Sequence, residues 1–192
     1  VSAWHLLRKQ HVELMRISMS MGLTLILIST IGNAVTGHFN GQNVALRQPA
    51  KLAAMEAQWE TVEGAGFPLI LIPDAANERN AVEALVIPKL TSFLATHNPN
   101  ATIVGLKDFA PELRPPVGLT FWSFRIMILL GVFLLIVAIL GYIWNKKGVL
   151  EQKTGFLKLL TWIIPVPYIA TTFGWIVAEV GRQPWTVYGL IS

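Results

Sequence analysis

Three long apolar stretches separated by polar segments dominate the chain. They cover residues 14–36, 119–144 and 156–180, and the few charges inside them lie near their ends. Each stretch reaches the about 20 residues that an α-helix needs to cross a hydrocarbon core of about 30 Å. The pattern therefore predicts an all-α integral membrane protein with three full transmembrane helices.

The longest polar stretch, residues 37–118, separates the first two predicted spans and is expected to form a loop domain with short helices. Residues 49–61 place Leu52, Met55 and Trp59 at helical spacing. The run 63–80 predicts a short apolar strand between turn residues, and 81–98 predicts short helices broken at Pro88.

Charge is distributed unevenly around the predicted spans. Residues 38–118 hold six basic and eight acidic side chains, a net charge of −2, whereas the whole chain is net +4. Cytoplasmic loops carry the excess of Lys and Arg. Residues 1–13 are accordingly expected to be the cytoplasmic end of an earlier span and 145–155 a cytoplasmic loop. Residues 37–118 and 181–192 are expected in the periplasm.

Composition excludes several classes of chemistry. The absence of cysteine rules out a disulfide scaffold and any thiolate-ligated metal within this chain. The basic residues flank apolar stretches and form no patch, so no nucleic-acid partner is expected. The four histidines lie outside the predicted spans and are assigned no metal, and no phosphate-binding or hydrolase motif is present.

Ionisable side chains at the outer edge of the membrane are the first candidates for function. Arg125 and Glu179 lie inside the second and third predicted spans, and Arg182 follows closely. Such residues are costly in a membrane and mark functional sites, although snorkelling to the interface explains them equally well. Together with Met127 they would offer two cations, a carboxylate and a thioether to an anionic, metal-bearing ligand.

Four candidate residues have ordinary alternatives. Met127 would usually be packing filler in an apolar helix, and Trp175 would usually be an interfacial or packing residue. Lys51 and Glu56 lie five residues apart, about 140° around a helix, where a solvated charged face is the common explanation. The two could still flank one polar head group, and the carboxylate could accept a proton from a hydroxylated substrate.

Several motifs together resemble subunit I of the cytochrome bd-type quinol oxidases. They are SAWHLL at 2–7, QPAKLAAMEAQWET at 48–61, VGLKDFAPELRPPV at 104–117, FWSFRIM at 121–127 and GWIVAEVGRQPW at 174–185. The resemblance covers essentially the whole chain, but only the middle-to-C-terminal part of the family's subunit. The termini also lack an initiator Met and a signal peptide, so we interpret the chain as a piece of a longer protein.

The resemblance implies a role for each candidate residue. Lys51 and Glu56 match the quinol-binding residues of the periplasmic Q-loop, and Met127 matches the axial ligand of haem b558. Arg125 matches the arginine associated with that haem. Glu179 matches the glutamate at haem b595, Trp175 the tryptophan beside the haems, and Arg182 a haem-site arginine.

The resemblance also implies cofactors, partners and a location. The cofactors would be haem b558, haem b595 and haem d or a b-type haem in its place. Subunit II, a small accessory subunit and membrane lipid would be partners, with quinol and dioxygen as substrates, in the bacterial cytoplasmic (inner) membrane. The compact Q-loop matches the short-loop type, which the family associates with cyanide-insensitive members. The histidine partner of the b558 methionine and the haem d ligand lie upstream of Val1, so the isolated chain is expected to be inactive.

Two other functions are compatible with the residues alone. The chain could be a non-enzymatic membrane docking or assembly protein, with Met127 as packing and with Lys51 and Glu56 solvated. It could also be part of a transporter in which Arg125 and Glu179 form an intramembrane pair on an ion pathway. Neither alternative explains why the KLAAME, FRIM and GRQPW motifs occur in this order.

Overall fold

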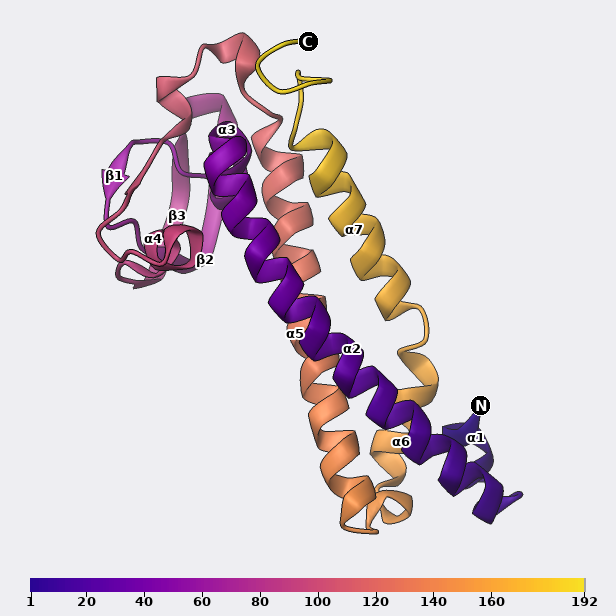
Figure 1. Cartoon of the computed structure of the whole chain (residues 1–192). Helices are drawn as coiled ribbons and strands as arrows, with labels where there is room; N and C mark the ends of the chain where they lie inside the picture. The colour runs from indigo at the N-terminus through magenta and orange to yellow at the C-terminus, as the bar shows by residue number, and fades with distance from the viewer. Residues whose placement is uncertain (192) are drawn as a thin grey trace. The chain divides into compact units, whose positions relative to one another are not determined.

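The computed structural model describes residues 1–191 and is mostly helical (Figure 1). The chain divides into two compact units. Unit 1 contains Val1–Val35 and Met127–Thr171, and unit 2 contains Thr36–Ile126 and the segment that starts at Thr172. Three helices contribute to both units: α2 (Val12–Arg47), α5 (Val117–Lys146) and α7 (Val166–Val180).

Unit 1 is a helical bundle. Besides its parts of α2, α5 and α7 it holds α1 (Ser2–Leu7), the 3₁₀ turn η4 (Leu150–Gln152) and α6 (Thr154–Trp162), and α1 packs against α6. Its core is formed by buried apolar side chains from these elements, among them Leu6, Met19, Leu23, Val137, Leu150, Phe156 and Leu157. The two long helices keep many apolar side chains exposed, as expected for helices that face lipid.

Gly141 lies where α5 comes close to side chains of α2 and α6. A Cβ at this position would lie 2.7 Å from Leu23 Cδ2 on α2 and 3.2 Å from Phe156 Cζ on α6. Residue 141 therefore has no room for a side chain where α5 meets the other two helices.

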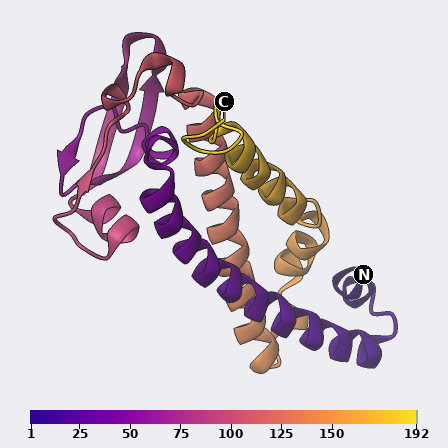
Figure 2. The same ribbon diagram turned by 45° about the horizontal axis from the view of Figure 1, so that its top comes forward.

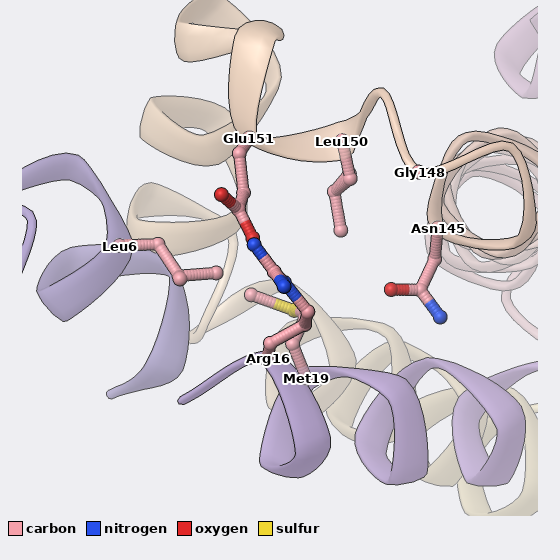
Figure 3. Close-up of a pocket in the computed structure, with 7 residues that line it drawn as sticks. All are labelled: Leu6, Arg16, Met19, Asn145, Gly148, Leu150 and Glu151. Atoms are coloured by element: carbon pink, nitrogen blue, oxygen red, sulfur yellow. The ribbon is translucent and has the colours of Figure 1, made fainter. Parts of the chain in front are cut away.

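An ion pair closes one end of unit 1. Arg16 Nε donates to Glu151 Oε1 at 2.6 Å, joining α2 to η4, and both side chains line a cavity of about 220 Å³ (Figure 3). Because both charges are well exposed, the pair contributes little to stability.

Two helices, α2 and α5, are long and apolar enough to cross a membrane. The third of the three predicted transmembrane helices is replaced by a bent pair of helices, which would together count as one broken span. Residues 156–180 do not form one helix, because α6 ends at Trp162, α7 begins at Val166, and the two are bent by 45°. Pro165 lies in the break and Pro167 in the first turn of α7, and proline removes a helical hydrogen bond and clashes with the preceding turn.

Unit 2 contains strands as well as helices, which corrects the all-α prediction. The order along the chain after α2 is α3 (Pro49–Glu56), β1 (Val62–Glu63), β2 (Phe67–Asp74), β3 (Arg79–Ile87), α4 (Leu90–Thr96) and β4 (Thr102–Ile103). Short 3₁₀ turns follow at Leu106–Asp108 and Pro111–Leu113 before α5 begins. Strands β1 and β4 pair antiparallel, and β2 pairs antiparallel with β3 (Figure 2).

The β2–β3 hairpin replaces a helix that we expected over the first part of residues 81–98. The strand predicted within 63–80 is present as β2, but residues Arg79–Ile87 pair with it as β3. The connecting turn is fixed by the Asp74 side chain, which accepts hydrogen bonds from Asn77. The helix expected after Pro88 is present as α4.

Two buried clusters hold unit 2 together. The larger one joins α3 to the start of α5 and consists of Ala53, Ala54, Ala57, Trp59, Leu71, Leu106, Val117 and Phe121. The smaller one, formed by Ala65, Ala95 and Ile103, lies under α4. Small alanines on α3 let neighbouring elements approach it closely, and this packing positions the candidate site.

Candidate functional site

Helix α3 carries both predicted quinol residues and is almost completely buried. Pro49 occupies its first turn, and Ala57 ends it in the left-handed conformation with φ of 49°. Six of its residues, including Lys51 and Glu56, are buried. The two charged side chains lie on different sides of α3 and contact different helices.

Lys51 faces the end of α7. Its Nζ donates to the carbonyl oxygen of Ala178 at 3.1 Å. Gly181 makes room for the lysine, because a Cβ there would lie 3.1 Å from Lys51 Cε and 2.5 Å from the Val177 oxygen. Burial lowers the pKa of Lys51, the nearby Glu179 carboxylate raises it, and the Arg182 guanidinium lowers it further. These three charged groups form one cluster, which we call the lysine cluster.

Within the lysine cluster, Arg182 donates to the Glu179 carboxylate three residues earlier. Both side chains are about 40% exposed, and Trp175, one turn before Glu179, is 66% exposed. Glu179 and Trp175 therefore form an accessible carboxylate and an accessible aromatic surface on the same helix.

Glu56 faces α5 on the other side of α3. Its Oε2 accepts a hydrogen bond from Arg125 at 2.9 Å, and the two side chains are only 8% and 12% exposed. Arg125 also donates to the Pro68 carbonyl oxygen at 3.0 Å. Its guanidinium lies 4.2 Å from the ring centre of Phe67 and 5.2 Å from that of Phe121. The arginine is thus fixed by a carboxylate, a carbonyl and two aromatic rings, and does not snorkel.

The environment of Glu56 suits a group that exchanges protons near neutral pH. Burial raises the pKa of Glu56 to about 7, although the positive charge of Arg125 opposes this shift. A carboxylic acid with such a pKa is present in both protonation states at neutral pH, which is the condition for efficient general acid–base work.

Glu56 also lines an open cavity of about 400 Å³ in unit 2. Trp59 and Asn80 line the same cavity, and the indole Nε1 donates to Asn80 Oδ1 at 3.0 Å. Other polar side chains around it are Glu60, Glu78, Arg79, Glu83 and Lys107. The cavity combines aromatic surface with polar groups, as small-molecule sites usually do.

The contacts of Arg125, Glu179 and Arg182 in the structure differ from two of our expectations. Arg125 and Glu179, the intramembrane pair of the transporter interpretation, do not pair, because Arg125 binds Glu56 and Glu179 binds Arg182. Arg125 and Arg182 consequently serve two separate clusters, not the single convergent one that we expected. Met127 follows Arg125 by two residues on α5 and is half-buried.

Several contacts at the site could not be found from the sequence. Pro68 and Ala178 take part through backbone carbonyl oxygens, so their residue types do not indicate a contact. Phe67 belongs to the apolar run that predicts a strand. The Arg125–Glu56 pair had a partial signal, since both residues were singled out as costly or chemically suited. The Glu179–Arg182 pair had a stronger one, since the two residues are also three positions apart on the chain.

The polar atoms around the candidate iron ligands fit haem groups. Within residues 1–191, Arg125 Nε and Arg182 Nε are buried and lack a hydrogen-bond partner. Each belongs to an arginine that lies within three residues of a candidate ligand, Met127 or Glu179. Haem iron accepts thioether ligands, and guanidinium groups bind carboxylates such as haem propionates.

Comparison with known proteins assigns the chain. The family described as "Cytochrome bd terminal oxidase subunit I" matches residues 1–192. The chain belongs to this family. The match confirms the resemblance carried by the KLAAME, FRIM and GRQPW motifs.

Individual relatives of the cytochrome bd family support the assignment. The chain is 34% identical to "Cytochrome bd ubiquinol oxidase subunit 1" of Bacillus subtilis and 29% identical to "Cytochrome bd-II ubiquinol oxidase subunit 1" of Escherichia coli. It is covered completely in both matches but spans only 43% and 50% of the relatives' lengths. The fold matches the bd oxidase structure from Geobacillus thermodenitrificans with a TM-score of 0.83 at 32% identity, over 98% of this chain and 43% of that one.

Proposed function

We propose that the chain supplies the quinol-oxidising site and two haem ligands of a terminal respiratory oxidase. The complete enzyme would oxidise two quinols and reduce one dioxygen to two waters. The observation that carries the proposal is Glu56: a buried carboxylate with a pKa near 7 that lines an open cavity and is held by Arg125. The relatives named ubiquinol oxidases support this choice of substrate class.

Glu56 would act as the proton acceptor for the quinol hydroxyl. Arg125 engages Oε2 of the carboxylate, which leaves Oε1 for the substrate. A quinol loses its two protons as it gives up two electrons, so an ionised carboxylate beside the hydroxyl lowers the barrier to oxidation. Trp59, packed at the same cavity, would offer an aromatic face to the quinol ring.

Lys51 would act as a positioning residue at the second side of α3. It ties α3 to α7 through Ala178 and lies near Glu179 and Arg182. With Glu56 holding α5, the short helix α3 connects the helix that carries Met127 to the helix that carries Glu179. Lys51 and Glu56 thus contact α7 and α5, the two helices that are proposed to bind haem.

Met127 would hold haem b558 through its thioether sulfur, and Arg125 would interact with the same haem. Glu179 would serve haem b595, with Trp175 and Arg182 next to it, and haem d or another b-type haem would complete the set. When bound, these haems would supply the electron transfer from quinol to dioxygen. We further propose subunit II and an accessory subunit as partners, and the bacterial cytoplasmic membrane as location, with residues 37–118 in the periplasm.

A spectrum and a turnover assay test the proposal in the intact oxidase. Met127→Leu should remove the low-spin b band from the dithionite-reduced minus oxidised spectrum. Glu56→Gln should keep the haem content and lower quinol oxidation at least about tenfold, because it removes one proton acceptor. An unchanged b band in the first variant, or unchanged turnover in the second, would contradict the corresponding assignment.

A further inference from the structure

Two histidines and a glutamine that do not line the proposed quinol cavity meet at one point in unit 2. His38 and Gln42 lie one turn apart on α2, and His97 caps the C-terminal end of α4. The two Nε2 atoms of His38 and His97 are 2.9 Å apart. The amide nitrogen of Gln42 lies 2.7 Å from His97 Nε2 and 3.3 Å from His38 Nε2.

Hydrogen bonds satisfy this triangle only if one atom is shared between two partners. A neutral imidazole nitrogen either donates one proton or accepts through one lone pair. If His38 donates to His97, the single lone pair of His97 must also accept from Gln42. If the amide of Gln42 is flipped, one imidazole N–H must be shared between the amide oxygen and the other imidazole.

A cation at the centre satisfies all three groups at once. Two imidazole lone pairs and the amide oxygen of a flipped Gln42 would then point to the same position. For a tetrahedral zinc ion with Zn–N distances of about 2.0–2.1 Å, ligand atoms are about 3.3 Å apart. The observed separations of 2.7–3.3 Å approach this spacing, so only a small expansion of the triangle is needed.

The surroundings allow a metal to enter and hold the ligands in place. His97 is exposed and His38 and Gln42 are half-buried, so solvent reaches the triangle. The backbone of His97 is fixed by a hydrogen bond from its N–H to the Phe93 oxygen at 2.8 Å, and the Phe93 and Phe39 rings flank the imidazoles. In the part of the chain that the structure describes, no three His, Cys, Asp or Glu residues are grouped so that they could hold a metal ion. The site is therefore defined by imidazole and amide ligands.

We propose that His38, His97 and Gln42 form a binding site for a divalent transition-metal ion, with water completing the coordination. Imidazole ligands suit Zn²⁺, Ni²⁺ and Cu²⁺ and disfavour Mg²⁺ and Ca²⁺. A bound ion would clamp the end of α2 to the end of α4, and thus fix the start of the polar segment that continues into α3.

Equilibrium dialysis of the purified, chelator-stripped oxidase against Zn²⁺ tests the site, with metal content measured by mass spectrometry. The wild-type protein should bind one more equivalent of Zn²⁺ than His38→Ala or His97→Ala. Loss of a ligand's outer hydrogen-bond partner already weakens metal binding by about 10- to 100-fold. Loss of one imidazole should therefore weaken Zn²⁺ binding at least about tenfold. His11→Ala, which removes an exposed histidine in unit 1, is the matched control and should bind as the wild type does.

Substitution of Gln42 separates a metal site from a structural contact. Gln42→Glu should tighten Zn²⁺ binding because a carboxylate is a stronger ligand than an amide, whereas Gln42→Leu should weaken it. Tighter binding cannot result from misfolding. Equal Zn²⁺ content in the wild type, His38→Ala and His97→Ala, or equal affinity in the two Gln42 variants, would overturn the proposal.

Discussion

At the scale of single residues, Arg125 connects the two halves of the proposed chemistry. Its guanidinium holds the Glu56 carboxylate, and its position in the chain is two residues from Met127. A buried ion pair is weak support for stability, because desolvation of the two charges offsets much of their attraction. The pair is better explained by its effect on Glu56, since Arg125 counteracts the large rise in pKa that burial causes.

Removal of the Arg125 charge should shift the pH dependence of quinol oxidation. The ionised form of Glu56 is the proposed proton acceptor, so kcat/KM should rise with pH around the Glu56 pKa of about 7. In Arg125→Met the opposing charge is lost, the pKa rises further, and the rising limb should move to higher pH. The readout is the pH at which kcat/KM rises in the intact oxidase. The maximum value of kcat/KM is not used, because it also depends on haem content.

Arg16→Met is the control for this shift. Arg16 is an arginine of unit 1 that pairs with Glu151 at 2.6 Å and lines a different cavity from Glu56. Its removal should leave the limb in place. The assignment of Glu56 as the titrating base would be wrong if both arginine variants moved the limb equally, or if neither did.

The candidate residues could be predicted from sequence, but their partners could not. Arg125 and Glu179 were recognisable because a charge near a membrane is costly, and the 140° separation of Lys51 and Glu56 already indicated two directions. The pairing of Glu56 with Arg125 joins residues 69 positions apart. No local pattern encodes such a contact, because it depends on how the loop folds back onto α5.

At the scale of elements, the sequence predicts correctly those helices and strands whose structure follows from their own local pattern of apolar residues. Helices α2 and α5 follow from long apolar runs, and strand β2 from a short apolar run between turn residues. Residues 79–87 contain Ala, Glu and Leu, which favour helix, yet they form β3 because β2 offers a partner for their backbone groups. Our prediction followed hydropathy over residues 156–180 and missed the break between α6 and α7, although Pro165 and Pro167 are a sequence signal for it.

Glycines in α5 provide a test of the helix packing in unit 1. Gly141→Ala should lower the apparent melting temperature of the detergent-solubilised oxidase, because the new methyl group would overlap Leu23 and crowd Phe156. Overpacking of this kind costs about 1–3 kcal/mol. Gly131→Ala, on the same helix with nothing within 4 Å of the added Cβ, should leave the melting temperature unchanged or raise it slightly. Similar losses in both variants would show that helix flexibility, and not the contact with α2 and α6, sets the stability.

At the scale of the whole molecule, charge asymmetry is the main clue to orientation. Residues 38–118 are net negative, and the basic excess lies in the loops on the opposite side of the predicted spans. We therefore predict the orientation from the positive-inside rule, with residues 37–118 outside.

Cysteine labelling in whole cells tests this orientation directly, because the chain has no cysteine of its own. In an oxidase freed of its other cysteines, Ala76→Cys in the exposed turn between β2 and β3 should react with a membrane-impermeant maleimide added outside. Lys147→Cys, in the loop after α5, should react only after the membrane is permeabilised. The reverse pattern would place residues 37–118 in the cytoplasm and remove the basis for a periplasmic quinol site.

The ionisation of Glu56 also links the stability of the folded loop to the acidity of the compartment around it. Its pKa rises from 4.5 to about 7 on folding, so the folded state binds the proton more tightly than the unfolded chain does. The resulting stabilisation is complete below pH 4.5 and disappears as the pH rises through about 7. An outer surface acidified by respiration would therefore favour the folded form of the segment that is proposed to accept protons from quinol, and an alkaline exterior would loosen it.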